Sequence, residues 1–198
     1  QDKLKTTPGA AGSLLGFIEA NTGNPYYCAR AVFILAQLRD ARGPDYVRAQ
    51  LGSEDAQQRI IAFRALRLAG REPILPLIRL LADDPSPAVR REILHPLRDI
   101  ELDKALEPLG KLIAGYDGRN RWYLEAIGTV CDGRSAVIYE KLVRPTQGDP
   151  KSWTRREKNL AWRLRSQQAL SDLEQCMTTQ DTGIEEFRRL AYTFALCY

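Results

Sequence analysis

The chain has 198 residues, 44% of them hydrophobic, and is therefore long enough to bury a sizeable core. Its 29 basic and 25 acidic residues leave a net charge of +4, too small a surplus to indicate a nucleic-acid-binding surface by charge alone. No apolar run reaches the roughly 18 residues of a membrane-spanning helix, so we expect a water-soluble chain with no membrane insertion.

Caps and breakers predict helices along the whole chain. Leu, Ala, Arg, Glu and Gln are abundant and β-branched residues never alternate at a period of two, which predicts an all-α fold. Proline in a first turn and glycine after a last turn set helix bounds, as at Pro73 and Gly70. In chain order the expected helices span residues 13–20, 26–40, 44–51, 54–69, 73–82, 88–99, 102–116, 120–131, 135–143, 153–165, 168–177 and 184–197. His95-Pro96 interrupts one of them, so a kink or an early end is expected there.

No linker-like stretch divides the chain. Its Pro, Gly and Ser residues never gather into a segment long enough to separate two domains, so residues 1–198 are expected to form a single domain. Residues 1–5 contain neither a starting methionine nor the apolar core of a signal peptide. We therefore expect the chain to be a piece excised from a longer protein or a processed form.

The helices carry an internal repeat. With an offset of 31 residues, three sets of positions fall into register: Arg59, Arg90 and Arg121; Ala62, Ile93 and Leu124; and Val47, Ile78 and Leu109. A unit of helix, turn and helix cannot cover its apolar face alone, and stacking on its neighbours buries a continuous core. About six such pairs fit the chain, which predicts a right-handed α-solenoid with extended binding faces rather than closed pockets.

One turn of this repeat resembles a known signature. Residues 83–92 read Asp-Asp-Pro-Ser-Pro-Ala-Val-Arg-Arg-Glu, an acidic turn followed by proline and then by Val-Arg on the second helix, and resemble the HEAT repeat. The resemblance implies HEAT-like helix pairs, in which an aspartate and an arginine of successive repeats form a ladder. It would make Arg59, Arg90 and Arg121 the arginines of that ladder.

Two further segments are similar to the HEAT region of large secreted bacterial proteins. They are residues 115–128, from Gly-Tyr-Asp-Gly-Arg-Asn-Arg-Trp-Tyr to Ala-Ile-Gly, and residues 161–170, which begin Ala-Trp-Arg-Leu-Arg-Ser. Together with the repeats, the likeness covers residues 40–198. Those proteins combine a sugar-dehydrogenase-like β-propeller, a HEAT segment and a c-type cytochrome domain. The resemblance implies a connector or binding platform in a periplasmic or secreted protein, and a cytoplasmic location stays open.

Few residues are suited to catalysis or metal binding. Cys28, Cys131, Cys176 and Cys197 lie far apart without a CxxC or CxxCH motif, which excludes the usual zinc and haem sites and favours buried free thiols. His95 is the single histidine and precedes a proline, so we expect it at the surface or at a cap. No glycine-rich phosphate loop is present, and carboxylate pairs fall at turns and helix starts. We expect no catalytic residue, no metal, no cofactor and no enzyme activity.

One group of residues mixes arginine with aromatic side chains on or beside the second helices of adjacent pairs. Its members are Arg119, Arg121, Trp122, Tyr123, Arg155, Arg156 and Trp162, with Trp153 beside them. Second helices line the concave face of a solenoid, and Arg with exposed aromatics is typical of protein-binding hot spots and of surfaces that stack on nucleobases or sugars. The alternative is structural, with Trp122 and Trp162 in the core between repeats and the arginines at ladder or solvated positions.

Two functions of different classes fit these features. The first is a noncatalytic scaffold or connector that contacts a protein partner or neighbouring domains of the same chain. The second is DNA binding, because HEAT-like DNA glycosylases are similar in size, all-helical and basic, although no aspartate here can be assigned to their catalytic role. A HEAT-like bilin lyase is a third interpretation, and the sequence shows no pigment context for it.

Overall fold

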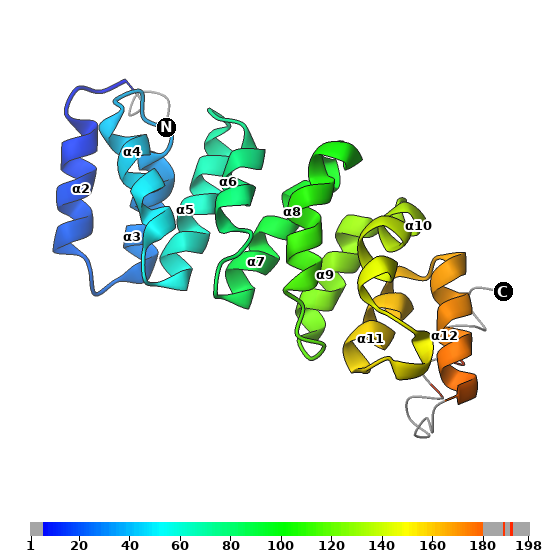
Figure 1. The fold of residues 1–198 in the computed structure, drawn as a ribbon. Coiled ribbons are helices and arrows are strands. Elements are labelled where there is room, and N and C mark those ends of the chain that lie inside the picture. Colours follow the sequence, from blue (N-terminus) through cyan, green and yellow to red (C-terminus); the bar gives the residue numbers. More distant parts are fainter. Residues whose placement is uncertain (1–5, 180–187, 189–190, 192–198) are drawn as a thin grey trace. The chain divides into compact units, whose positions relative to one another are not determined.

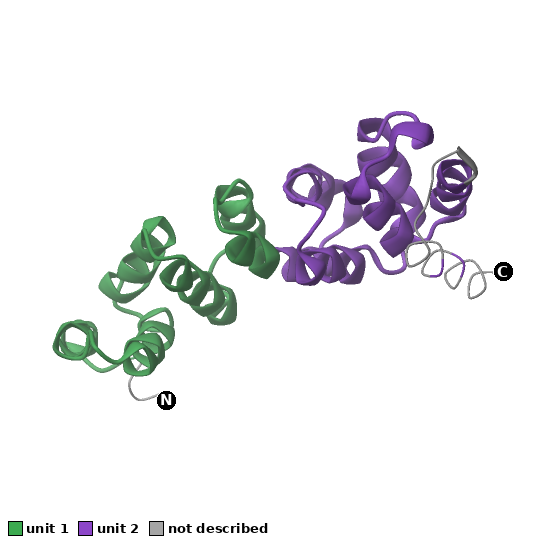
Figure 2. Ribbon diagram, turned by 90° about the horizontal axis from the view of Figure 1, so that it is seen from below, with its two compact units in different colours: residues 1–93 green, residues 94–198 purple. Residues whose placement is uncertain are grey.

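The computed structural model describes residues 6–179 together with Arg188 and Ala191. These residues form eleven helices and no strand, so the all-α prediction is confirmed. The chain divides into two compact units, residues 1–93 (unit 1) and residues 94–198 (unit 2), which Figure 2 shows in two colours. The expectation of a single domain over residues 1–198 stays a prediction.

Unit 1 is a series of antiparallel helices, drawn from blue to cyan-green in Figure 1. They are α2 (Ala10–Ala20), α3 (Pro25–Leu35), α4 (Arg42–Ala49), α5 (Ala56–Ala69), α6 (Ile74–Leu81) and α7 (Pro87–Leu94), whose last residue passes the unit boundary. A short 3-10 turn, η1 (Gln50–Gly52), extends α4. Helix α3 packs against α2, α4 and α5, so these four helices share one core.

Side chains at the helix ends explain where the helices of unit 1 begin and end. Asn24 caps α3 with its side-chain oxygen, and Pro25 occupies the first helical position, where no N–H is needed. Asp55 caps α5 by accepting a hydrogen bond of 2.8 Å from the N–H of Gln57. Gly70 ends α5 in the left-handed region at φ +63°, as its position in the sequence predicts.

The apolar positions of the 31-residue register are core positions. Val47, Ile78, Leu109, Ala62 and Ile93 are fully buried, and Leu124 is 4% exposed. Burying a large aliphatic side chain contributes about 1.5–3 kcal/mol to folding, so the apolar positions of the repeat contribute to the stability of each unit.

The first arginine of the register, Arg59, forms a buried salt bridge. Its Nε and Nη2 each donate to a different carboxylate oxygen of Asp84 at 2.7 Å, and Nη1 donates to the carbonyls of Ser53 and Glu54 at 2.7 and 3.0 Å. Asp84 belongs to the turn between α6 and α7, and Arg59 lies in α5. The bridge therefore ties one helix pair to the next, as the ladder prediction requires.

The other two arginines of the register differ. Arg90 donates through Nη1 to the carbonyls of Asp84 and Pro85, six and five residues before it, which are the same relative positions that the first arginine uses. Arg121 has a side chain that is 83% exposed and comes only within 4.0 Å of Glu125 on its own helix. The ladder prediction is confirmed at the first position and is wrong at Arg121, because the start of its helix turns this side chain toward solvent.

Unit 2 contains the remaining helices, drawn from green to orange in Figure 1. They are α8 (Leu102–Ala114), α9 (Arg121–Cys131), α10 (Ser135–Ile138), α11 (Arg155–Leu164) and α12 (Gln167–Thr179), with 3-10 turns η2 (His95–Asp99), η4 (Arg144–Thr146) and η5 (Pro150–Ser152) and a π turn, η3 (Tyr139–Val143). Helix α11 packs against both α9 and α12. This places the start of α11 beside the loop that leads into α9.

Two of the expected helices of this region change form along their length. Helix α7 ends at Leu94 and the chain continues as the 3-10 turn η2, so the predicted interruption at His95-Pro96 is confirmed. The helix expected over 135–143 is α-helical only to Ile138 and continues as the π turn. The helix expected over 184–197 lies outside the described residues, apart from Arg188 and Ala191.

A buried polar network accompanies the π turn. Tyr139 is fully buried, and its hydroxyl lies 2.9 Å from a carboxylate oxygen of Asp172 and 3.2 Å from the side-chain oxygen of Gln147. The same carboxylate accepts hydrogen bonds from Gln168 at 2.8 Å and forms an ion pair with Arg144 at 3.2 Å. Burial and the neighbouring carboxylate raise the pKa of the Tyr139 phenol, so it stays a neutral donor.

Candidate functional site: an arginine-lined cavity in unit 2

One cavity of unit 2 brings together residues from two segments of the chain. It measures about 360 Å³ and is lined by Tyr116, Arg119, Arg121, Leu124, Arg155, Asn159 and Trp162. The first segment runs from the end of α8 through a loop into α9, and the second is the first two turns of α11. Four of the seven residues expected from the sequence, the arginines at 119, 121 and 155 and the tryptophan at 162, therefore surround one hollow.

Side-chain caps hold the loop at residues 117–120 in place. A carboxylate oxygen of Asp117 accepts hydrogen bonds from the N–H groups of Arg119 at 2.8 Å and Asn120 at 2.9 Å. Asn120 in turn caps α9 by accepting from the N–H of Tyr123 at 3.1 Å. These backbone hydrogen bonds, from Asn120 and then from Arg119, lower the pKa of Asp117, so the carboxyl is ionised at neutral pH.

A glycine lets this loop lie directly against α11. Gly118 is buried and has φ +78°, a backbone conformation that favours glycine. A Cβ at this position would lie 2.9 Å from the Cβ and 3.1 Å from the Cα of Arg156. Asn159, which is 4% exposed, adds a link from α11 by donating to the Gly118 carbonyl at 3.0 Å and to the Tyr116 hydroxyl at 3.1 Å.

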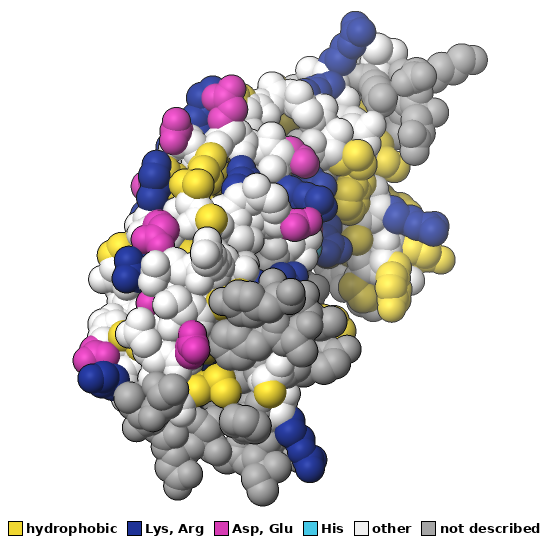
Figure 3. Space-filling view, turned by 90° about the vertical axis from the view of Figure 1, so that its right-hand side faces the viewer, with side chains coloured by type: hydrophobic (Ala, Val, Ile, Leu, Met, Phe, Trp, Pro, Cys, Tyr) yellow, Lys and Arg dark blue, Asp and Glu magenta, His cyan; other side chains and the backbone are white. Residues whose placement is uncertain are grey.

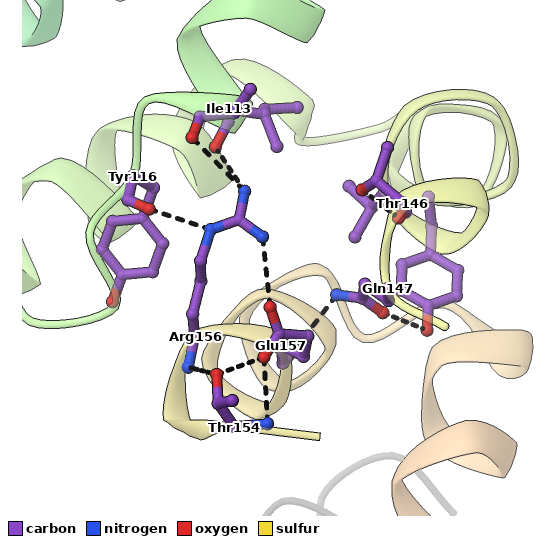
Figure 4. Close-up of polar contacts among 10 residues, drawn as sticks. Ile113, Tyr116, Thr146, Gln147, Thr154, Arg156 and Glu157 are labelled. Atoms are coloured by element: carbon purple, nitrogen blue, oxygen red, sulfur yellow. Dashed lines mark hydrogen bonds and ion pairs between the residues drawn. The ribbon is translucent and has the colours of Figure 1, made fainter. Parts of the chain in front are cut away.

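Helix α11 begins with a capping box. The backbone N–H of Thr154 donates to the carboxylate of Glu157 at 2.9 Å, and the Thr154 hydroxyl accepts from the N–H of Arg156 at 3.3 Å (Figure 4). Burial raises the pKa of Glu157, but hydrogen bonds from the Thr154 hydroxyl and from N–H groups lower it by more. The net effect is a lowered Glu157 pKa. The cap fixes Arg155 as the first residue of the helix.

The electrostatic character of the cavity is positive. Arg121 and Arg155 stand at the first positions of α9 and α11, so two helix N-termini, each the positive end of a helix dipole, flank the cavity. No Asp or Glu is among the lining residues. Glu125, the acidic residue of α9, accepts a hydrogen bond of 2.8 Å from Nε of Arg163.

Two of the lining arginines keep their guanidinium groups available. Among the residues that the structure describes, the side chains of Arg119 and Arg155 form no hydrogen bond and no ion pair, and both residues are exposed. Arg121 has only the 4.0 Å approach to Glu125. The cavity thus presents guanidinium donors that the described residues do not use.

Arg156 was expected at the same site, and the structure places its guanidinium elsewhere. Nε donates to the Tyr116 carbonyl at 2.9 Å, Nη2 to the carbonyls of Ile113 and Ala114 at 3.3 and 3.4 Å, and Nη1 lies 3.2 Å from Glu157, most of which Figure 4 shows. The last carbonyls of a helix have no partner within it, and here the guanidinium satisfies those of α8. Arg156 therefore supports the site and does not line it.

The aromatic residues of the expected group also separate. Tyr123 is 1% exposed, and its hydroxyl donates to the Leu112 carbonyl at 2.8 Å, so it belongs to the core. Trp122 is 72% exposed and does not line the cavity, which rules out the core position considered for it. Trp162 is half-buried and forms a wall of the cavity, with the guanidinium of Arg165 over its ring at 5.8 Å.

Three lining residues were not expected from the sequence. They are Tyr116, Leu124 and Asn159. Helical spacing could have indicated the last, because positions 155, 159 and 162 follow one another by four and three residues on one helix face. Nothing local indicated Tyr116, because it lies after the end of α8 and reaches the cavity only through the packing of the loop.

The cysteines and the histidine lie apart from this cavity. Cys131 and Cys176 are buried thiols, Cys28 is half-buried, and Cys197 lies outside the described residues. Burial raises the pKa of the Cys131 thiol to about 12. His95 is exposed. Within the described part of the chain, no group of three or more His, Cys, Asp or Glu residues could hold a metal ion, and no helix is long and apolar enough to span a bilayer.

The lining of the cavity is suited to binding charge. Guanidinium groups stay protonated at any physiological pH, so they bind anions through forked hydrogen bonds and do not exchange protons. The indole, phenol and leucine side chains add an apolar wall. No family model matches the chain, and no curated protein and no solved structure is significantly similar to it.

Proposed function

We propose that this chain is a noncatalytic binding module that holds a protein partner, or a neighbouring domain of the same longer chain, at the arginine-lined cavity of unit 2. The observation that carries the proposal is the convergence of Arg119, Arg121, Arg155 and Trp162 on one hollow. Arginine and tryptophan are enriched among the residues that dominate binding energy in protein interfaces, particularly where a pocket receives a partner side chain.

We extend this proposal to the architecture. The helix pairs are HEAT-like repeats of a right-handed α-solenoid, about six in number. The buried Arg59–Asp84 bridge between successive pairs supports this, as does the equivalent use of backbone carbonyls by Arg59 and Arg90. The resemblance of residues 115–128 to connector segments of secreted bacterial proteins supports a connector role in a periplasmic or secreted protein.

Charge reversal at the cavity tests the proposed function. The double variant Arg119→Glu/Arg155→Glu replaces two guanidinium groups that make no hydrogen bond or ion pair in the described structure, so it should leave the fold intact. Crosslinking of the wild-type protein in its native source, followed by mass spectrometry, identifies the residues of the partner or neighbouring domain that contact the cavity. These crosslinks should disappear in the double variant.

The matched control is the double variant Arg30→Glu/Lys141→Glu, which changes the charge by the same amount at exposed positions outside the cavity. It should retain the crosslinks. Far-UV circular dichroism checks that both variants are folded. Crosslinks that persist in Arg119→Glu/Arg155→Glu would contradict the proposed function.

A further inference from the structure

The positive charge at the cavity is a local feature of unit 2. Between residues 94 and 198 the chain carries 16 basic and 15 acidic residues, so the unit as a whole is nearly neutral. On the described part of the face drawn in Figure 3, basic and acidic side chains are interspersed. Three arginines around one hollow without an acidic lining residue therefore mark a site for a compact anion rather than a broad basic surface.

The same molecule shows what an arginine of this chain does with a carboxylate. Arg59 holds Asp84 through two parallel hydrogen bonds of 2.7 Å. Such forked pairing matches the geometry of carboxylates and phosphates and is stronger than a single neutral hydrogen bond. Arg119 and Arg155 have the same donor groups, and neither forms an ion pair with a carboxylate of the described residues, so an external carboxylate can take that place.

The size and the walls of the cavity limit the occupant further. A volume of about 360 Å³ lies near the lower end of the roughly 300–1,000 Å³ typical of small-ligand sites. A cavity of this volume can receive one or two side chains. It is too small to enclose a helix or a nucleic-acid duplex. The half-buried indole of Trp162 and the side chain of Leu124 form an apolar wall beside the arginines, which suits an apolar or aromatic neighbour of the anionic group.

A nucleic acid fits these observations less well. Binding of a phosphate backbone uses a track of basic residues that follows the strand over several nucleotides. The near balance of basic and acidic residues in unit 2 does not favour such a track. Of the anions that a guanidinium fork accepts, a carboxylate within a short peptide matches both the compact positive site and its apolar wall.

We infer that the cavity of unit 2 is a docking site for an acidic peptide segment of the partner, in which an Asp or Glu side chain lies next to an aromatic residue. The carboxylate pairs with Arg119 and Arg155, and the aromatic ring packs on Trp162. This inference rests on the proposed function and specifies the chemistry of the partner.

Fluorescence anisotropy of labelled peptides tests the inference. The probe is a fluorescein-labelled peptide of repeating Asp-Phe-Glu-Gly, and the control peptide carries Asn and Gln in place of Asp and Glu. The acidic peptide should bind and the amide peptide should bind at least about tenfold more weakly, since one lost charge-assisted pair corresponds to about that factor in affinity. Equal binding of the two peptides would overturn the inference.

Variants of the intact chain locate the binding. Arg119→Ala and Arg155→Lys should each weaken binding about tenfold, the second because an ammonium keeps the charge and loses the fork. Lys141→Ala should leave the affinity unchanged, because Lys141 is exposed and outside the cavity. If the cavity variants bind like wild type and far-UV circular dichroism shows them folded, the peptide binds elsewhere and the inference is wrong.

Two competitors separate the carboxylate site from other anion sites. Inorganic phosphate should displace the peptide only at far higher concentration than the unlabelled peptide does. Single-stranded oligo(dT) should bind weakly. Displacement by phosphate at the peptide's own concentration would show a site for free anions, and tight oligo(dT) binding that falls steeply from about 50 to about 200 mM salt would show a nucleic-acid site. Either result overturns the inference.

The two proposals can fail separately. If cavity crosslinks exist and vanish in Arg119→Glu/Arg155→Glu but the acidic peptide does not bind, the proposed function holds and the ligand class is wrong. If the peptide binds as expected but the crosslinks persist in that variant, the ligand chemistry holds and the proposed function is wrong.

Discussion

The molecule uses the same side chain in opposite ways at two places, the buried bridge between α5 and the α6–α7 turn in unit 1 and the cavity of unit 2. In unit 1, Arg59 is 8% exposed and is saturated by a carboxylate and two carbonyls. In unit 2, Arg119 and Arg155 are exposed at a cavity and form no hydrogen bond or ion pair among the described residues. The residue type does not decide between a structural and a binding role; the presence of an internal acceptor does.

The sequence register explains part of this difference. Asp84 lies 25 residues after Arg59, the first arginine of the register, whereas the position 25 residues after Arg121 is Thr146, which has no carboxylate. The arginine of the register in unit 2 therefore lacks the acidic acceptor of the ladder at the equivalent position. This separation of arginines that stabilise from arginines that are available can be tested by substitution.

The largest effect is expected for Arg59→Ala. The substitution leaves the Asp84 carboxylate, whose side chain is 4% exposed, without its charged partner. Breaking a buried ion pair costs about 3–5 kcal/mol, and we expect a loss of about 3 kcal/mol in the free energy of unfolding of unit 1. Urea unfolding followed by far-UV circular dichroism measures it, because the three tryptophans, Trp122, Trp153 and Trp162, all lie in unit 2.

Arg64→Ala is the matched control. Arg64 lies on the same helix and pairs with Glu92, but its side chain is 54% exposed. An exposed ion pair contributes about 0–1 kcal/mol, so this variant should unfold almost like wild type. If Arg59→Ala and Arg64→Ala lose similar amounts of unfolding free energy, burial does not determine how strongly these arginine ion pairs stabilise the unit.

Gly118→Ala should have the next largest effect. A methyl group there would overlap the backbone of Arg156, and φ is +78°. Overpacking and backbone strain each cost about 1–3 kcal/mol, so we expect unit 2 to lose about 2–3 kcal/mol, measured by urea unfolding with tryptophan fluorescence. The acidic peptide should also bind more weakly, because the loop carrying Arg119 must move away from α11.

Gly133→Ala separates the two causes of that loss. Gly133 has φ +74° but nothing within 4 Å of its Cβ position. Substituting Gly133 introduces backbone strain without overpacking. It should lower the free energy of unfolding by about 1 kcal/mol and leave peptide binding unchanged. If both alanines cost the same, the close approach of the loop to α11 does not matter for the cavity.

The neighbouring arginines of α11 give the sharpest contrast within one unit. Arg156→Ala removes charge-assisted hydrogen bonds to the carbonyls at the end of α8 and should cost about 1.5–3 kcal/mol in urea unfolding. Arg155→Ala should change stability by less than about 0.5 kcal/mol and weaken peptide binding instead. An equal loss of stability in the two variants would contradict the division between supporting and lining arginines.

Much of the fold could be predicted from the sequence, because its causes are local or periodic. Caps such as Asn24, Asp55 and Gly70 act within a few residues, and the two apolar sets of the 31-residue register select positions that are all buried. The change to a π turn at Tyr139 could not be predicted. Its hydroxyl reaches Asp172, 33 residues away, and no local pattern encodes that contact.

The candidate site was predictable as a region and not residue by residue. Consecutive helical residues point about 100° apart, so Arg121, Trp122 and Tyr123 had to face three directions: the cavity, solvent and the core. The same geometry separates Arg155 from Arg156. Which of them faces the cavity depends on how the 117–120 loop docks on α11, and that contact joins segments about 40 residues apart.

The smallest expected effect concerns the charge of Asp117, which organises that loop. The hydrogen bonds from the N–H groups of Asn120 and Arg119 place the folded-state pKa of Asp117 below its ordinary value. A lowered pKa means that the ionised carboxylate stabilises the folded loop above the unfolded pKa of about 3.9, and that this stabilisation is lost as the pH falls through the folded pKa. Carboxyl NMR titration should therefore show Asp117 titrating at a lower pH than an aspartate in an unstructured peptide.

Asp117→Asn tests whether this charge also acts on the cavity. The amide oxygen can still accept from the two N–H groups, so the loop should keep its form, while the negative charge beside Arg119 disappears. Stability should then depend less on pH below about 4, and the acidic peptide should bind slightly better at neutral pH, by less than about threefold, because exposed charges interact weakly in water. If a folded Asp117→Asn protein binds the peptide more weakly, the Asp117 carboxylate orients Arg119 toward the ligand. The arginines of the cavity would then depend on an internal acidic partner, as Arg59 does.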